Sequence, residues 1–431
     1  MGQKATVKNN IGNAGFDYSN EWYLLPHDPE DKFLGSLCTG RVLHDKSAFR
    51  KRKDTNLKSR IRVTNHANIC NELSEPYIYP VKLAIGTRVE RMDEHIWYAA
   101  KVELLEPINF WEIFSNCGDV FTGTINLSGQ PYLPQGLKFP AVLKGDLIFN
   151  YNVLPSVIKL PEEIEGELII QFCSIPPTWE FPRKAKKISL TGSSFYQNIN
   201  FLKTDYSTIS IQGCHHGPDV IFPREFPGQI QLEDETLSPG FKLPDTVGIL
   251  SLSNVRFETG ATLPRTVLGK LVMHDIKDFN KISMPDFCDK IAIAECKLPM
   301  NLLSSVKNLK EIEFIQCKLP DNFDITDLKI GKLSFVSMDI PKRLKLAPNF
   351  TGLLKFEDVT FPVGFKLPET LNGRLEILYS TMKGPVRLPE DKGYEIVMIE
   401  GDDMTNLAAP EWVKKKIVFV KSNRCDDDLP F

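Results

Sequence analysis

The chain has 431 residues, 42% of them hydrophobic and 25% charged, and a formal net charge of −3. Its length allows two domains, and its composition is that of an ordinary soluble globular protein. The balanced charge does not favour nucleic acid as a partner, and because no apolar run reaches about 18 residues we expect no transmembrane helix.

The first residues, Met-Gly-Gln-Lys-Ala-Thr, fit the pattern for N-myristoylation, with Gly2 as the acceptor and Thr6 in the hydroxyl position. The pattern is short and matches often by chance, so an ordinary flexible N-terminus over residues 1–20 is the alternative. One acyl chain anchors a protein only marginally, and membrane association would therefore need a second signal.

Residues 21–118 are expected to form a β-rich N-terminal domain whose type the sequence does not identify. Strands are predicted at residues 22–25, 34–43, 59–63, 78–83 and 96–105. A short helix is predicted at residues 110–116, with Gly118 ending it.

Within this domain, residues 46–62 carry eight basic side chains and one acid, which indicates an exposed loop. The loop is built mainly from Arg50, Lys51, Arg52, Lys53, Lys58, Arg60 and Arg62. One hypothesis is contact with an anionic membrane surface, for which this loop would be the second signal beside Gly2. The alternative is a solvated loop, and the lack of interleaved aromatic residues disfavours nucleic acid.

Motifs for enzymatic chemistry are weak. Nine cysteines are present without a Cys-x-x-Cys pair and no secretory signal opens the chain, so we expect mostly reduced thiols in a cytoplasmic protein. A thiol enzyme using Cys38 with His44 or His95 is one alternative for the N-terminal domain. The spacing of His66 and Cys70 could ligate zinc on a helix, but no companion motif accompanies it and no cofactor motif occurs, so no metal and no cofactor is predicted.

The remainder of the chain repeats one short phrase, whose clearest copy is GFKLPETLNGRLEI at residues 364–377. An apolar pair with one residue between its members recurs fourteen times, and every step is 20 or 21 residues. The pairs are Leu147/Phe149, Leu168/Ile170, Ile188/Leu190, Ile209/Ile211, Ile230/Leu232, Leu250/Leu252, Leu271/Met273, Ile291/Ile293, Ile312/Phe314, Leu333/Phe335, Leu354/Phe356, Leu375/Ile377, Ile396/Met398 and Ile417/Phe419. This period predicts a solenoid over residues 119–421, followed by an acidic tail at 422–431.

Each pair predicts one short strand with both side chains inward, stacked on its neighbours in a parallel sheet. The glycine before many of the pairs, as in Gly352 and Gly373, is expected at a corner that leads into the strand. Short helices are predicted at residues 300–309 and 321–328, and a closing helix at 411–416. His215 and His216 are expected in a turn, and Cys296 and Cys317 as stacked buried residues or a disulfide.

The phrase L-P-x-x-Φ-x-G-x-L-x-Φ, where Φ is apolar, resembles the short leucine-rich repeats of bacterial effector proteins. The resemblance covers about two thirds of the chain and implies a curved binding scaffold with no catalytic residue. The sequence departs from that family because no regular asparagine follows the strand and an extra residue often precedes it. A single-chain parallel β-helix is the structural alternative.

The residue between the two members of each pair points outward, and we expect these residues to bind a partner. The polar members of the predicted surface are Ser189, Ser210, Gln231, Ser251, Glu313, Ser334, Lys355 and Glu376. Both ends of the row are apolar, with Ile148 and Ile169 at one end and Val397 and Val418 at the other. The sequence therefore predicts a scaffold for protein–protein interaction, and the resemblance and the N-terminal pattern together imply a bacterial effector that acts in a host cell. The alternatives are the thiol enzyme, with repeats that select its substrate, and a membrane-associated scaffold.

Overall fold

The computed structural model describes short segments of the N-terminal part and most of the repeats. The described residues are 22–25, 42–44, 61–64, 77–83, 89–91, 96–99, 101–105, 108–109, 115, 118–128, 133, 137–177, 179–196, 198–202, 205–216, 219–277, 279–389, 394–399, 406–408 and 417–420. The chain divides into two compact units, residues 1–194 and 195–431, which are taken separately below.

The N-terminal strands form one antiparallel sheet. They are β1 (Trp22–Leu25), β2 (Val42–His44), β3 (Ile61–Thr64), β4 (Tyr77–Lys82), β5 (Val89–Arg91), β6 (Ile96–Ala99), β7 (Lys101–Leu104) and β8 (Ile108–Asn109). Their order is β2-β7-β4-β1-β3-β6-β5, with β8 paired to β4. A β-rich N-terminal part is thus confirmed. The predicted strand at 34–43 is described only from Val42, and the predicted helix at 110–116 lies almost wholly outside the described residues.

The rest of the chain is a parallel β-solenoid of about 13 turns, each about 21 residues long. In the first unit its strands are β9 (Val120–Thr122), β10 (Ile125–Asn126), β11 (Val142–Lys144), β12 (Leu147–Asn150), β13 (Glu163–Gln171), β14 (Ser174–Ile175) and β15 (Lys184–Thr191). Strand β16 (Ser194–Phe195) lies at the boundary between the units.

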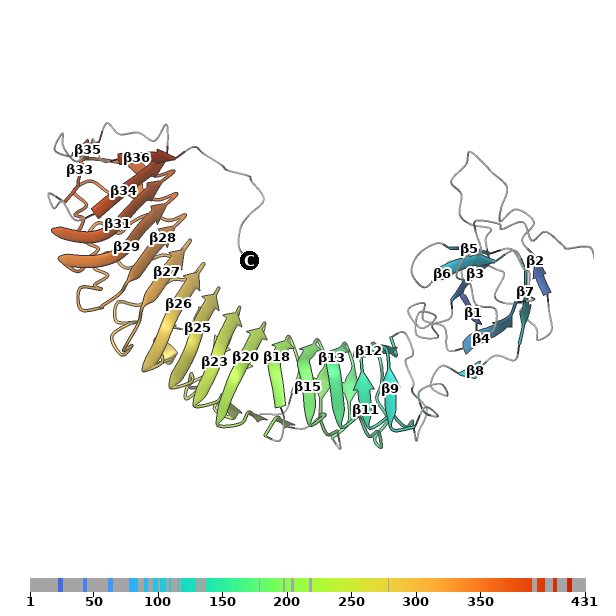
Figure 1. Cartoon of the computed structure of the whole chain (residues 1–431). Helices are drawn as coiled ribbons and strands as arrows, with labels where there is room; N and C mark the ends of the chain where they lie inside the picture. The colour runs from blue at the N-terminus through green and yellow to red at the C-terminus, as the bar shows by residue number, and fades with distance from the viewer. Residues whose placement is uncertain are drawn as a thin grey trace, which may run out of the picture. The chain divides into compact units, whose positions relative to one another are not determined.

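In the second unit one long strand recurs in every turn, and Figure 1 shows these strands stacked from β18 to β36. The long strands are β18 (Asp205–Gln212), β20 (Glu225–Glu233), β23 (Thr246–Ser253), β25 (Thr266–His274), β26 (Phe287–Ala294), β27 (Glu311–Ile315), β28 (Lys332–Val336), β29 (Asn349–Glu357), β31 (Thr370–Leu378), β34 (Tyr394–Ile399) and β36 (Ile417–Val420).

Shorter strands also pair in parallel on other sides of the turns. They are β17 (Ile199–Asn200), β19 (Val220–Ile221), β21 (Thr236–Leu237), β22 (Phe241–Lys242), β24 (Arg256–Phe257), β30 (Thr360–Phe361), β32 (Thr381–Met382), β33 (Val386–Arg387) and β35 (Leu407–Ala408). The pairings are β17-β19-β22, β21-β24, β30-β32 and β33-β35. Backbone hydrogen bonds therefore join successive turns on more than one side, as in a parallel β-helix.

All fourteen predicted apolar pairs lie in the long strands, at matching positions from turn to turn. The first thirteen pairs are buried, and in the last pair Phe419 is 50% exposed. The core is therefore a set of apolar ladders along the solenoid axis, as the sequence predicts. Its largest ladder consists of phenylalanines: the rings of Phe314, Phe335 and Phe356 stack with centroids 5.5 and 5.3 Å apart.

The predicted helices at 300–309 and 321–328 are wrong. Residues 300–305 form hydrogen-bonded turns, such as Val306 N–H to Leu303 O at 3.2 Å, and the described helical segment nearest to them is the short 3-10 helix η2 (Phe279–Lys281). The apolar residues Leu302, Leu303 and Val306 that suggested a helix are buried in the core from these turns. Each turn must place its apolar residues in the shared core of the solenoid, and this tertiary packing overrides the local preference for a helix.

In β13, β25, β29 and β31 the glycine before the pair lies within the long strand and not at a corner, whereas Gly145 and Gly331 lie just outside their strands. In β29 and β31 the stacked Gly352 and Gly373 have φ values of 121° and 137°, which L side chains rarely adopt. A Cβ at Gly352 would overlap the carbonyl oxygen of Gly331 in the preceding turn. The corner itself comes two residues after the pair, where Asp234, Asn254 and Asp275 adopt positive φ.

Candidate functional site

In the second unit, seven of the eight predicted binding residues lie on one side of the parallel sheet, which we call the outer face: the outward side chains of the long strands of that unit. Ser189 belongs to β15 in the first unit, and the other seven belong to the second unit. Seven of the eight are half-buried, whereas Ser334 is fully buried. Of the apolar end residues, Ile148 and Ile169 are half-buried, Val418 is 53% exposed, and the side chain of Val397 lies outside the described set.

The centre of the outer face is more apolar than the sequence analysis predicts. On β26, Ala292 and Ala294 are 6% and 3% exposed, and next to Ala294 the following two strands carry Ile315 and Val336 at matching positions. These four residues and Ser334 form what we call the apolar centre. The prediction considered only the residue between each pair and missed Ala294, Ile315 and Val336. They directly follow the pair, and the same period-two alternation could have found them.

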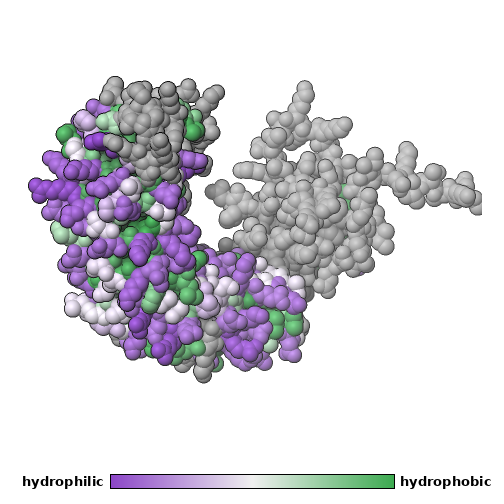
Figure 2. Space-filling model, turned by 60° about the vertical axis from the view of Figure 1, so that its left-hand side comes forward, coloured by the Kyte–Doolittle hydropathy of each residue, from purple (hydrophilic) through white to green (hydrophobic). Residues whose placement is uncertain are grey.

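Most charged side chains near the apolar centre are paired within the chain. Lys290 Nζ lies 2.9 Å from Glu311 Oε1, and Lys355 Nζ lies 2.5 Å from Glu357 Oε2. Farther along, Arg374 Nε lies 2.7 Å from Glu376 Oε1. These pairs range from half-buried to exposed and remain in contact with solvent, so each adds little stability, and they leave a polar rim around the centre. Figure 2 shows the same mixture on one side of the molecule, where hydrophilic residues surround smaller hydrophobic areas.

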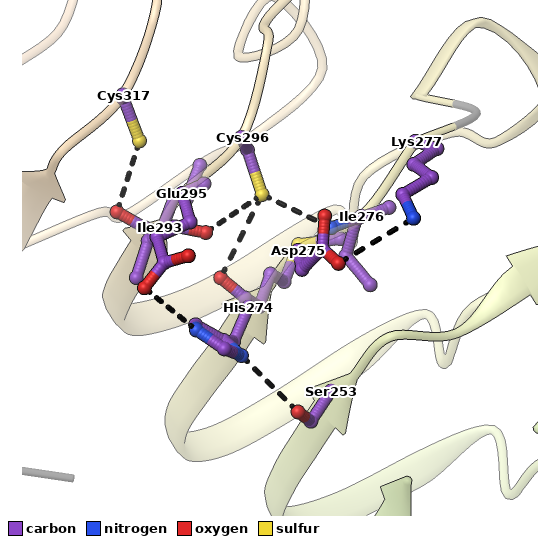
Figure 3. A network of polar contacts seen from close by, with 11 residues as sticks. Ser253, His274, Asp275, Ile276, Lys277, Ile293, Glu295, Cys296 and Cys317 are labelled. Atoms are coloured by element: carbon purple, nitrogen blue, oxygen red, sulfur yellow. Dashed lines mark hydrogen bonds and ion pairs between the residues drawn. The ribbon is translucent and has the colours of Figure 1, made fainter. Parts of the chain in front are cut away.

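A chain of hydrogen bonds joins Ser253, His274 and Glu295 on three successive turns (Figure 3). The Ser253 hydroxyl lies 3.2 Å from His274 Nδ1, and His274 Nε2 lies 3.2 Å from Glu295 Oε1. A hydroxyl, an imidazole and a carboxylate in this order also occur in catalytic triads, which need oxyanion donors as well. The nearest backbone amides, those of Asn254 and Asp275, already donate to the carbonyls of His274 and Ala294. The arrangement thus ties adjacent turns together.

A row of buried side chains follows the corner and bonds one turn to the next. The backbone N–H of Cys173 donates to Ser193 Oγ at 3.1 Å, and that of Cys214 donates to Glu235 Oε1 at 2.8 Å. Farther along, the amide of Ile276 donates to Cys296 Sγ at 3.2 Å. Serine, glutamate and cysteine thus satisfy corner amides that would otherwise be buried without a partner, in a chain where no regular asparagine follows the strand.

His216 lies in the turn after β18, as predicted, and its imidazole reaches into this row. His216 Nε2 lies 3.3 Å from Glu235 Oε2, and the two side chains are 11% and 2% exposed. The imidazole also packs edge-on against Phe241 with centroids 5.7 Å apart. The Glu235 carboxylate is therefore held by the Cys214 amide on one oxygen and by His216 on the other.

The five described cysteines, Cys173, Cys214, Cys288, Cys296 and Cys317, are buried and form no disulfide. Cys296 and Cys317 occupy matching positions in adjacent turns without a disulfide (Figure 3), which confirms the prediction of stacked buried residues. Their thiols point to separate backbone carbonyls: Cys296 Sγ to Ala294 O at 2.9 Å and Cys317 Sγ to Ile293 O at 3.2 Å.

Burial raises the pKa of the Cys296 thiol from 9.0 to about 12. We expect iodoacetamide at pH 8 to alkylate Cys296 about 1000-fold more slowly in the folded chain than in urea, because the thiolate is the nucleophile and its fraction falls tenfold per pKa unit. Mass spectrometry of the peptide that contains Cys296 measures both rates, and equal rates would contradict the prediction. The raised pKa also means that the neutral thiol stabilises the fold fully below pH 9 and that this contribution is lost as the pH rises toward 12.

Several predicted sites lie outside the described residues. Gly2, Cys38, His95 and the basic residues from Arg50 to Arg60 are among them, while His44 ends β2 and Arg62 lies in β3. Within the described ranges, no three His, Cys, Asp or Glu side chains are placed to hold one metal ion. Among the same residues, no helix has the length and apolarity needed to cross a membrane.

A second surface feature is a hollow of about 940 Å³ on another side of the turns after β27. Its lining includes Lys318, Lys342 and Lys383 together with Asp321 and Asp339. Three cations face two carboxylates, so the hollow has only a small excess of positive charge and offers no strong preference for a charged ligand. The comparisons with known proteins add no candidate: no family model, no curated protein and no solved structure matches this chain.

Proposed function

We propose that this chain is a scaffold for protein–protein recognition and that it binds its partner through the outer face of the parallel sheet. The observation that supports the proposal most directly is the apolar centre on β26–β28 with its rim of charged side chains. Protein interfaces commonly combine an apolar, well-packed centre with a polar rim. The repeats stack rigidly, so such a surface is preorganised for binding.

The wider proposal is that the scaffold belongs to a bacterial effector that acts in a host cell, in the cytoplasm or at a membrane. It rests on the leucine-rich-repeat resemblance of the L-P phrase and on the N-terminal pattern with Gly2 as acceptor. The basic residues of 46–62 would then attract an anionic membrane surface and supply the second signal that a single acyl chain needs.

Binding through the outer face is tested by comparing the wild-type chain with two variants, each of which replaces an apolar residue by arginine. Ile315→Arg places a charge in the apolar centre, and Val363→Arg places the same charge at a residue that is 69% exposed beyond β30. Each form is immobilised and exposed to eukaryotic cell lysate, captured proteins are quantified by mass spectrometry, and the best candidate is purified and titrated.

We expect a partner whose affinity falls at least about tenfold with Ile315→Arg and changes little with Val363→Arg, since a buried charge at the centre of an interface is costly and one outside it is not. Circular dichroism checks that both variants keep the wild-type fold. Equal losses in the two variants, or no partner that distinguishes wild type from Ile315→Arg, would contradict binding through the outer face.

A further inference from the structure

One carboxylate in the middle of the outer face has no partner within the described chain. Glu313 lies in β27, in register with Ala292 on one side and Ser334 on the other, and is half-buried. No Lys, Arg or His nitrogen of the described residues forms an ion pair with it, in contrast to Glu311 two residues earlier, which pairs with Lys290. A half-buried carboxylate beside apolar surface is costly unless something pairs with it.

The side chain of the neighbouring Ser334 also lacks a polar partner within the described residues. Its side chain is fully buried although it points to the outer face, and its Oγ has no hydrogen-bond partner. Lys355 is in register with Ser334 on the next strand but does not bond its hydroxyl. Lys355 Nζ instead lies 2.5 Å from Oε2 of Glu357 on its own strand. Buried hydroxyls in folded proteins are nearly always hydrogen-bonded, so a donor from a partner that displaces the side chains covering Ser334 would satisfy this one.

Glu313 and Ser334 are in register on adjacent strands, which lie about 4.8 Å apart in a sheet. Both can accept hydrogen bonds, and Ile315 and Val336 provide apolar surface at the next outward position of the same strands. A ligand that fits them carries a positive charge, several donors in a fixed arrangement, and an aliphatic stem.

We propose that the outer face receives an arginine side chain of the protein partner, with its guanidinium on Glu313 and Ser334 and its methylenes on Ile315 and Val336. Arginine fits better than lysine because its planar group can bond a carboxylate with two donors and still offer others to a hydroxyl. It is also less strongly hydrated, so it enters a half-buried site more readily. This inference rests on the proposed function and names the chemistry that the partner brings.

The experiment is a selection from a random peptide display library on the immobilised full chain. We expect the recovered peptides to contain arginine and to lose at least about tenfold in affinity when that arginine is replaced by citrulline, its neutral isostere, because the charge-assisted bonds are lost. Glu313→Gln should cause a comparable loss. Glu311→Gln is the matched control on the same strand, since its carboxylate is already paired with Lys290, and should change affinity less than about twofold.

Thermal unfolding provides a second readout. Because Glu313 has no partner to lose and its unpaired charge is costly, Glu313→Gln should not lower the midpoint of thermal unfolding by more than about 2 °C, so weaker binding cannot be attributed to a damaged fold. Recovery of peptides without arginine, or of peptides that bind Glu313→Gln as well as wild type, would overturn the inference.

The outcomes separate this inference from the proposed function. Peptides that lack arginine but are lost on Ile315→Arg would refute the arginine site and leave the outer face as the binding surface. Peptides that bind Ile315→Arg normally would refute both. Failure to enrich any peptide on wild type over Ile315→Arg would also count against both.

Discussion

Replacing Phe335 by alanine is expected to lower the free energy of unfolding by about 4 kcal/mol, near the upper part of the range for large-to-small changes in a core. Phe335 is fully buried, and its ring stacks between Phe314 and Phe356 at 5.5 and 5.3 Å. In a solenoid each turn contacts only its neighbours, so a cavity at this point weakens the interfaces with both adjacent turns at once.

Urea unfolding followed by circular dichroism measures the effect, and Phe419→Ala is the matched control. Phe419 occupies the same position of the repeat in the last long strand but is 50% exposed, so its loss should cost less than about 1 kcal/mol. Equal losses at the two positions would show that burial in the ladder is not what stabilises the turns. Separation of the Phe335→Ala transition into two phases would still agree with the argument, because nearest-neighbour coupling permits it.

The repeat and the inward pairs could be predicted from sequence because one physical constraint recurs in every turn. A strand that must bury Leu354 and Phe356 leaves a period-two signal, and stacking repeats that signal every 20 or 21 residues. The corner after the strand leaves no such signal. Residues as different as Tyr151, Asp234 and Gln316 adopt the same positive φ there, so no residue type marks the position.

The candidate site was harder to predict from the sequence, because the pairing of its side chains depends on residues in other turns. The outward position of Glu313 and Ser334 is predicted from alternation alone. In the structure the two residues are in register on adjacent strands, although Ser334 is as buried as its inward neighbours. Whether an outward residue is paired depends on side chains in neighbouring turns, about 21 residues away, such as Lys290 beside Glu311. By alternation, Glu313 and Lys355 are equally close neighbours of Ser334 on the strands either side of it. The pairing of Lys355 with Glu357 instead could not be read from the sequence.

Replacing His216 by alanine is expected to cost about 3 kcal/mol of stability, because it leaves one oxygen of a buried carboxylate without its partner. Glu235 is 3% exposed, and its Oε2 lies 3.3 Å from the imidazole. The other oxygen keeps the amide of Cys214, which sits within the row that bonds adjacent turns. The loss should therefore appear as weaker coupling between the turns on either side of residue 216.

A double-mutant cycle with Glu235→Gln separates the charge from the packing. An amide in place of the carboxylate can still accept from Cys214 N–H and carries no charge, so Glu235→Gln should recover more than about 1 kcal/mol when added to His216→Ala. His215→Ala is the control in the same turn, since that side chain is exposed and should change stability by less than about 0.5 kcal/mol. If the double variant is no more stable than His216→Ala alone, the cost lies in lost packing against Phe241 and not in the unpaired charge, and Glu235 then requires another source of compensation within the core.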